Sequence, residues 1–330
     1  MEFIQLKAGK DDEGRRLDRI ARTLLADENL SQLYKALRSG LIKVNKKKTK
    51  GEYRIQPGDE IQVAAFLSKN IKNVIQKSPL TKKTLPEDWV ILRTDSLLFL
   101  NKPYDMNVQK AGKNDRALNE LVQEDYLSFH QKKDEASLSF KTGPLHRLDR
   151  RTTGLITFSQ NLEGARWFSE AMKTHSIKKN YLAIVEGNLE KHEIWTEKIS
   201  KGEEKASDSI KFHTVSVNFD DDNSKESRTE AVPLAQGLYR GKPVTLVNFL
   251  ISTGRTHQIR STSAFHSHPL LGDTAYGAEP VSEKQQLFLH SWSLEFPENP
   301  LGLPEKLTCP PGEIFVSVLK SALINLPPEL

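Results

Sequence analysis

The chain has 330 residues, of which 37% are hydrophobic, and its formal net charge is +5. This length predicts about two domains, and the hydrophobic content is sufficient for a packed core. The single cysteine, Cys309, excludes a disulfide framework and a cysteine-rich zinc site, so we expect no disulfide partner and a cytoplasmic location. We expect no signal peptide at the N-terminus, and no apolar run reaches the roughly 18 residues of a membrane span.

Residues 1–66 are predicted to form a small module of two helices followed by a β-ribbon. Apolar residues from Leu17 to Leu25 follow helical spacing. Further apolar residues alternate as in strands on both sides of turns at 45–46 and 57–59. The expected helix caps are Asp11 and Asp12 for the first helix and Ser31 for the second, which Gly40 ends.

Positive charge is concentrated in this module. Residues 31–58 contain eight basic residues against one acid, Glu52, which is typical of a nucleic-acid-binding surface. A solvated charge run on a loop is the alternative. The basic residues are Lys35, Arg38, Lys43, Lys46, Lys47, Lys48, Lys50 and Arg54, of which we expect Arg38, Lys43, Lys46 and Lys47 to bind substrate.

Residues 67–88 are interpreted as a linker, because lysines alternate there with polar residues and proline and the periodicity fades. Residues 89–330 are then a larger mixed domain. Its pattern predicts strands at 90–92, 97–100, 181–185 and 244–251, and an amphipathic helix at 162–174. Residues 287–290 and 314–319 could each add an element. The highly charged stretch 190–230 is expected to be a decorated loop or hairpin insert.

One stretch of this domain carries a candidate reactive group. In Leu145-His-Arg-Leu-Asp-Arg-Arg-Thr-Thr-Gly154, Asp149 lies among three arginines and just before a strand-like run. Fixed positive charge keeps a carboxylate ionised, and a positioned, ionised Asp can act as a nucleophile or a base. A turn with a satisfied surface ion pair is the alternative reading of the charge spacing.

Four motifs resemble those of the RluA-type pseudouridine synthases. His146-Arg-Leu-Asp149 with Arg-x-Thr-x-Gly154 resembles the family signature, and 179–187 is similar to its Lys-x-Tyr-x-Ala-x-Val-x-Gly strand. The stretch 253–260, with His268-Pro-x-x-Gly-Asp273 and Tyr276-Gly277, resembles the third motif, and Asn101-Lys-Pro103 the opening one. The first module resembles the small RNA-binding module of a ribosomal small-subunit protein, which many enzymes of this type carry.

The resemblance implies an α+β fold: the RNA-binding domain of helices and β-ribbon, then a catalytic domain with a mixed, mostly antiparallel sheet split by an active-site cleft. It implies that uridine in RNA is converted to pseudouridine without a cofactor or a metal, with large-subunit ribosomal RNA favoured and transfer RNA possible. We expect a monomer that has no membrane partner. The implied catalytic residues are Asp149, Tyr181 and Arg260, and the implied substrate contacts are Arg147, which fills the gap left by the extruded base, Lys102 and Arg255.

Several positions depart from the family pattern. Asp105 stands where a glycine is usual, and Gln109 where a histidine is frequent. Gln32 replaces a common basic residue, so one expected phosphate contact of the module is missing. The stretch after Arg260 is Ser-Thr-Ser-Ala, which is more polar than the usual pattern and is expected near the opening of the site.

Two functions of other classes are also compatible with parts of the sequence. A metal site for hydrolysis could use residues of the third motif and beyond, although their spacing forms no clear helical or hairpin pair. A non-catalytic RNA-binding or ribosome-assembly factor would also explain the basic module, whereas the complete Asp149, Tyr181 and Arg260 set favours an enzyme. The metal-site candidates are His257, His266, His268, Asp273 and His290.

Overall fold

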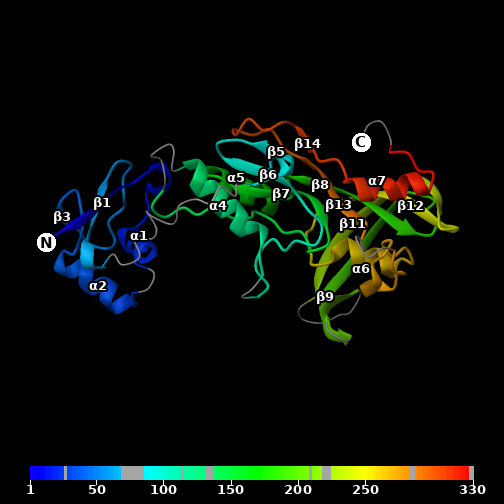
Figure 1. Ribbon diagram of the computed structural model, residues 1–330, viewed down its shortest axis with the longest axis horizontal. Helices are drawn as coiled ribbons and strands as arrows, with labels where there is room; N and C mark the ends of the chain where they lie inside the picture. Colours follow the sequence, from blue (N-terminus) through cyan, green and yellow to red (C-terminus); the bar gives the residue numbers. More distant parts are fainter. Residues whose placement is uncertain are drawn as a thin grey trace.

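The computed structural model describes residues 1–25, 28–67, 85–112, 115–130, 137–207, 210–217, 224–281 and 287–326, with only the backbone for 130 and 201–214. The N-terminal module lies at one end of the molecule and a sheet-based domain forms the rest (Figure 1). Leu67 packs against the core of the module, and Leu85 lies in the core of the larger domain. Most of the expected linker, 68–84, is outside the described residues.

The module combines two helices with a sheet of order β1-β4-β2-β3. Gly40 ends the second helix with φ 74°, a conformation that glycine adopts without strain. Asn45 and Lys46 form the tight turn of the hairpin with positive φ. The elements are β1 (Phe3–Lys7), η1 (Lys10–Asp12), α1 (Leu17–Leu24), α2 (Leu30–Ser39), β2 (Ile42–Val44), β3 (Lys47–Lys48), β4 (Glu60–Ala64) and η2 (Ala65–Leu67).

Two of the expected helix caps were wrong. Asn29, not Ser31, caps α2, because its Oδ1 accepts a hydrogen bond from Gln32 N at 2.9 Å. The helix therefore starts two residues earlier than predicted. Arg16 stands at the N-cap of α1 and makes no side-chain cap. Asp11 and Asp12 lie in η1 and bind the larger domain instead.

Asp12 joins the module to the larger domain. Its side chain is fully buried and accepts hydrogen bonds from Ser137 Oγ at 2.7 Å, Leu138 N at 3.0 Å and Ser139 Oγ at 2.5 Å. Leu138 packs against the apolar core of the module. Asp11 accepts a further hydrogen bond from Leu162 N at 3.0 Å. We call this contact the Asp12 socket.

The larger domain is built on a ten-stranded mixed sheet, with β14 paired to β13 at its side. Every strand pair is antiparallel among the described residues except β13 with β7. The main order is β10-β9-β11-β12-β8-β13-β7-β6-β5. The strands are β5 (Val90–Arg93), β6 (Leu97–Lys102), β7 (Thr153–Ser159), β8 (Lys178–Glu186), β9 (Glu193–Ser207), β10 (Ile210–Val217), β11 (Lys225–Tyr239), β12 (Lys242–Ile251), β13 (Leu289–Glu295) and β14 (Lys306–Thr308).

Helices cover this sheet through separate apolar clusters. Phe168 of α5 packs with Phe99 and Leu155. Leu118 and Val122 of α4 pack in a different cluster, together with strand residues that face the other side of the sheet, such as Leu98. A third cluster joins α7 to β8 and β12. The helical elements are α4 (Leu118–His130), α5 (Leu162–Lys173), α6 (Gln258–Phe265), α7 (Glu313–Ser321), η3 (Glu87–Trp89) and η5 (Thr274–Tyr276).

Most of the described part of the charged stretch 190–230 belongs to the main sheet, whereas 208–209 and 218–223 lie outside the described residues. Strands β9 and β10 pair as a hairpin, and β9 also pairs with β11, so these strands extend the sheet at one end (Figure 1). Of the two expected forms the hairpin is therefore present, but it is continuous with the sheet. The predicted strands at 181–185 and 244–251 are confirmed as the buried β8 and β12.

Candidate active site

The shortest strand pairing in the described part of the large sheet lies close to Asp149 in the sequence. Strands β13 and β7 pair along only two residue pairs, His290 with Thr153 and Ser291 with Gly154. Gly154 has φ 102°, and a Cβ there would lie 2.2 Å from Ser291 O. Only glycine therefore allows the two backbones to meet. The chain that enters β7 at this junction carries Asp149.

The segment before β7 is fixed by a buried histidine. His146 Nε2 accepts a hydrogen bond from Thr157 N at 3.0 Å, and its ring stacks on Phe168. Burial lowers the pKa of His146 to about 3, with a smaller contribution from Lys179, so the ring is neutral. The carbonyl of Asp149 accepts from Thr152 N at 3.1 Å, which closes the turn. The Asp149 side chain is thereby held at the start of the strand.

The Asp149 carboxylate faces two groups from the 253–260 segment. Its Oδ2 lies 3.5 Å from Arg260 Nη1 and 3.7 Å from His257 Nε2, and its side chain is 30% exposed. Arg260 thus places a positive charge beside the carboxylate. The geometry therefore brings together Asp149 and Arg260, two of the three expected catalytic residues.

Arg260 is oriented by a closer partner, Asp273. Its Nε and Nη2 donate to the Asp273 carboxylate at 2.7 and 2.8 Å, a bidentate contact that fixes the guanidinium plane. Burial by itself would lower the pKa of Arg260, but Asp273 and then Asp149 outweigh it and raise that pKa. Arg260 is therefore a permanent cation that presents its remaining nitrogen to Asp149.

His257 and Tyr276 complete the surroundings of Asp149. The Tyr276 hydroxyl lies 2.9 Å from His257 Nδ1 and accepts a hydrogen bond from Val215 N at 3.0 Å. His257 adopts φ 54°, a left-handed backbone conformation, at the N-cap of α6. Burial raises the pKa of Tyr276 to about 12. Sequence reasoning gave none of His257, Tyr276 and Asp273 a role in this site, although all three lie in or near the third motif.

Tyr181, the third expected catalytic residue, lines the same pocket from β8. It is 7% exposed, and burial raises the pKa of its hydroxyl to about 12. The nearby negative charge of Asp149 also raises it. A neutral phenol ring thus forms one wall of the pocket, which suits it to stack against a base.

A glutamine holds the loop that carries His257. Gln258 Oε1 accepts from Arg255 N at 3.0 Å and from Thr253 Oγ1 at 2.9 Å, while its Nε2 donates to Thr229 Oγ1 at 3.0 Å. Arg255 itself is exposed, and its Nε donates to Glu226 O at 3.1 Å. The structure thus places Arg255 at the rim of the pocket and pairs Arg260 with Asp149.

The pocket beside Asp149 is small. Its volume is about 90 Å³, the space of roughly three waters, so entry of a whole nucleoside requires side chains at its mouth to move. The exposed Arg147 and Arg255 are at that mouth. The lining residues are Arg147, Leu148, Asp149, Thr152, Tyr181, Ile251, Gly254, Arg255, His257, Gln258, Ile259, Arg260 and Leu289.

Lys102 lies outside this pocket. It is fully buried, and its Nζ donates to the carbonyl oxygens of Pro103, Met106 and Arg150, each at 2.9 Å. Burial lowers the pKa of Lys102 to about 7. The three carbonyl oxygens around its nitrogen match the three N–H donors of the charged ammonium group. All its donors are used within the protein, which supports a structural role for a residue expected to bind substrate.

The departures from the family pattern have local structural explanations. Asp105 adopts φ 59°, where glycine is usual, and pairs with Arg150 at 2.9 Å. Gln109 is exposed and is not part of the pocket lining. The expectation that Ser261, Thr262 and Ser263 lie near the opening was wrong, because they are buried in α6. Polar residues are tolerated there since two of the hydroxyls donate to Gln258 O.

The expected RNA contacts of the module differ in their surroundings. Arg38, Lys46 and Lys47 are exposed, and Lys48 continues the exposed basic hairpin. Lys43 is half-buried, with its Nζ 4.5 Å from the centre of the Phe3 ring. The hairpin therefore presents three consecutive lysines to solvent.

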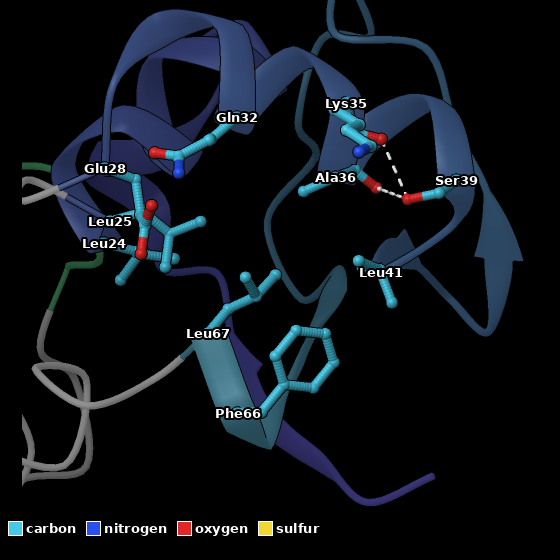
Figure 2. A pocket seen from close by; sticks show the side chains of 10 residues that line it. All are labelled: Leu24, Leu25, Glu28, Gln32, Lys35, Ala36, Ser39, Leu41, Phe66 and Leu67. Carbon is cyan, nitrogen blue, oxygen red and sulfur yellow. Dashed lines mark hydrogen bonds between the residues drawn. The ribbon is translucent and has the colours of Figure 1, made fainter.

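A larger hollow in the module has a different chemistry. It has a volume of about 660 Å³, and Figure 2 shows Phe66 and Leu67 of η2 facing Leu41 and the end of α1 across it. Phe66 is 59% exposed. The hollow is mainly apolar, and its described lining contains no pairing of a carboxylate with an arginine like that of Asp149 and Arg260. Its lining residues are Leu24, Leu25, Glu28, Gln32, Lys35, Ala36, Ser39, Leu41, Phe66 and Leu67.

The metal-site candidates are not gathered in one place. Among the described residues, no group of three or more His, Cys, Asp or Glu side chains could hold a metal ion. His266 binds Glu197, His268 lies against Glu186 O, and Asp273 binds Arg260. His290 Nε2 contacts Cys309 O. In the part of the chain that the structure describes, no helix combines the length and apolarity of a bilayer span.

Residues 96–265 match the RNA pseudouridylate synthase family, and residues 15–61 match the S4 domain. The chain belongs to the RNA pseudouridylate synthase family. It is an RNA pseudouridine synthase with an N-terminal S4 domain, so the family expected from the four motifs is confirmed.

Relatives match most of the chain. Ribosomal large subunit pseudouridine synthase C of Haemophilus influenzae is 27% identical over 302 residues, covering 88% of this chain and 86% of the relative. The protein of the same name from Escherichia coli K12 is 26% identical, covering 92% and 91%. The solved structure of human RNA pseudouridylate synthase domain containing 4 aligns with a TM-score of 0.57 at 21% identity, covering 77% of this chain and 98% of that one. This likeness confirms the predicted synthase fold.

Proposed function

We propose that this RNA pseudouridine synthase isomerises specific uridines of ribosomal RNA, with large-subunit RNA as the substrate and Asp149 as the reactive group. The observation that carries the proposal is the carboxylate of Asp149, 30% exposed, at 3.5 Å from Arg260 in a pocket walled by Tyr181. The names of the relatives support the choice of large-subunit RNA. Transfer RNA is the alternative substrate.

The reaction breaks the glycosidic bond, turns the uracil and rejoins it through a ring carbon, so no redox step and no imported group is needed. Asp149 can attack the sugar carbon or abstract the neighbouring sugar proton. Both routes need the carboxylate ionised, and Arg260 places a positive charge 3.5 Å from it. The two routes differ in whether a covalent intermediate forms.

Tyr181 and Arg147 have separate roles in this proposal. The neutral phenol of Tyr181 stacks on the uracil from its position inside the pocket. A target base in paired or stacked RNA has to be extruded, and the exposed Arg147 at the mouth fills the place it leaves. Arg255 at the rim is positioned for a phosphate. The basic hairpin of the S4 domain supplies affinity for RNA without base specificity.

The test is position-resolved pseudouridine mapping of ribosomal and transfer RNA from cells with and without the protein. Loss of pseudouridine at defined positions of large-subunit RNA, restored by wild-type protein and not by Asp149→Asn, is the expected result. Restoration by Asp149→Asn would identify a non-catalytic RNA-binding factor. Loss confined to transfer RNA would overturn the assigned substrate. The monomeric state and the cytoplasmic location stay predictions from the sequence.

A further inference from the structure

Lys179 in β8 is a buried lysine that has no partner among the described residues. The residue is 5% exposed, and its ammonium group forms no hydrogen bond or ion pair with any residue that the structure describes. Burial lowers the pKa of Lys179, and no neighbouring charge offsets it. Its neighbour Lys178 is exposed and pairs with Glu295 at 3.3 Å. An unpaired charge in such a place is costly to the fold, so an anion that binds there would be strongly favoured.

The ammonium group of Lys179 adjoins the Asp149 pocket. Lys179 and Tyr181 are two residues apart on one strand, so they point to the same face. Lys179 is also paired across the sheet with Ile251, which lines the pocket. Its Nζ lies 3.9 Å from the position that a Cβ on Gly254 would take. Gly254 is an exposed residue of the pocket wall. Because it has no side chain, it leaves the ammonium group of Lys179 less covered than any other residue there would.

The position selects the kind of anion. Uridine is neutral, so the charged groups of an RNA substrate are its phosphates. The pocket wall surrounds the base and sugar, whereas Lys179 lies just behind Gly254, beyond that wall. The nearby His146 ring is neutral, and no acidic side chain of the described residues forms an ion pair with Lys179. A backbone phosphate next to the extruded uridine would supply the negative charge.

We propose that Lys179 is a phosphate-binding residue that holds the RNA backbone beside the target nucleotide. The inference rests on the proposed function, because it needs a uridine bound at Asp149. It gives the enzyme a fixed point inside the catalytic domain, separate from the basic hairpin of the S4 domain. The contact is made in the ground state and in the transition state alike, so it contributes to affinity more than to turnover.

The experiment compares Lys179→Met with the matched control Lys178→Met in the full chain. Lys179→Met removes a buried unpaired charge and keeps the apolar volume, so the variant should unfold at the same or a higher temperature than wild type. Its affinity for a target RNA should fall roughly 10- to 100-fold, the range of one charge-assisted hydrogen bond. The slope of log affinity against log salt should decrease by about 0.7 to 0.9. Lys178→Met should change neither affinity nor slope.

Three readouts separate the outcomes. Thermal unfolding, RNA titration at several salt concentrations and single-turnover product formation are measured on the same proteins. A less stable Lys179→Met that binds RNA normally would show a structural lysine and overturn the proposal. Normal affinity with slow turnover would instead indicate that Lys179 acts on the departing base during the reaction. That result would also overturn the proposal. A failure of the proposed function is distinguishable, since the wild-type protein would then form no pseudouridine.

Discussion

Arg260 donates two hydrogen bonds to Asp273, at 2.7 and 2.8 Å. Its third nitrogen lies 3.5 Å from Asp149, so the guanidinium bridges one buried carboxylate and one partly exposed carboxylate. Asp273 thus sets the direction in which Arg260 meets the reactive group. The same arrangement makes single substitutions of Arg260 hard to interpret, because each also leaves Asp273 without its partner.

A double substitution separates stability from activity at this site. Arg260→Met should lower the free energy of unfolding by about 3–5 kcal/mol, because it leaves a buried carboxylate unpaired. Adding Asp273→Asn should restore much of this loss by removing that charge. Neither variant should recover turnover, since both lack the cation beside Asp149. Chemical denaturation and single-turnover assays measure the two properties, and a fully active double variant would show that Arg260 is only structural.

Asp149→Asn should reduce the single-turnover rate on the order of 1,000-fold or more, because the amide keeps the shape and loses the charge that performs the chemistry. RNA affinity and the unfolding temperature should change little. Product is measured by pseudouridine detection and affinity by filter binding. Retention of a substantial fraction of the wild-type rate would show that another residue is the reactive group.

Arg147→Ala should slow the step in which the target base leaves the stack. Arg147 is exposed at the pocket mouth, so its removal should not disturb the fold. We expect a roughly tenfold or greater slowing on a paired or stacked target, with partial rescue on unstructured RNA, where little stacking is lost. The comparison uses one target sequence in both contexts. Equal slowing in both would count against the gap-filling role.

The basic hairpin of the S4 domain can be tested by removing its exposed charge. Substituting Lys46, Lys47 and Lys48 together with Gln should reduce the slope of log affinity against log salt by about 2 to 3 units. Turnover at saturating RNA should change far less. A matched control replaces three exposed lysines of the other domain, Lys173, Lys242 and Lys320, with Gln. If the control lowers the slope as much, the hairpin is merely a solvated surface.

Lys102→Met tests whether Lys102 contacts RNA or supports the fold. Its three carbonyl acceptors would be left buried without donors, so the free energy of unfolding should fall by about 2–4 kcal/mol. At a temperature where the variant is folded, the salt dependence of RNA binding should equal that of wild type. A smaller salt slope with unchanged stability would instead support a phosphate contact.

Sequence patterns predicted the parts of the fold that depend on local chemistry. Gly40 at the end of α2, the Asn45-Lys46 turn and the buried strands β8 and β12 follow from propensity and periodicity. The cap of α2 was misplaced because Asn29 and Ser31 are both good caps, and only the Asn29 bond to Gln32 N decides between them. The strand order of the large sheet depends on pairings far apart in sequence, which local patterns do not encode.

The motifs predicted which residues form the candidate site. They did not predict the hydrogen bonds and ion pairs between those residues. The motifs identified Asp149, Tyr181 and Arg260, which the structure places around one pocket. That Arg260 binds Asp273 first, and that His257 reaches Asp149 from a left-handed backbone position, depends on how α6 sits against the loop before η5. The His257 conformation was not predictable from the sequence, because a positive φ is uncommon in any residue except glycine, although histidine is among the residues enriched there.

The Asp12 socket gives the S4 domain a second attachment besides the chain that leads out of it. Because Ser137, Leu138 and Ser139 hold Asp12 from the other domain, the basic hairpin and the Asp149 pocket are kept at one separation. This fixed separation predicts that the enzyme selects its target partly by distance along the RNA. A uridine would be chosen by its distance from the helix or loop that the hairpin grips, as well as by the bases that flank it.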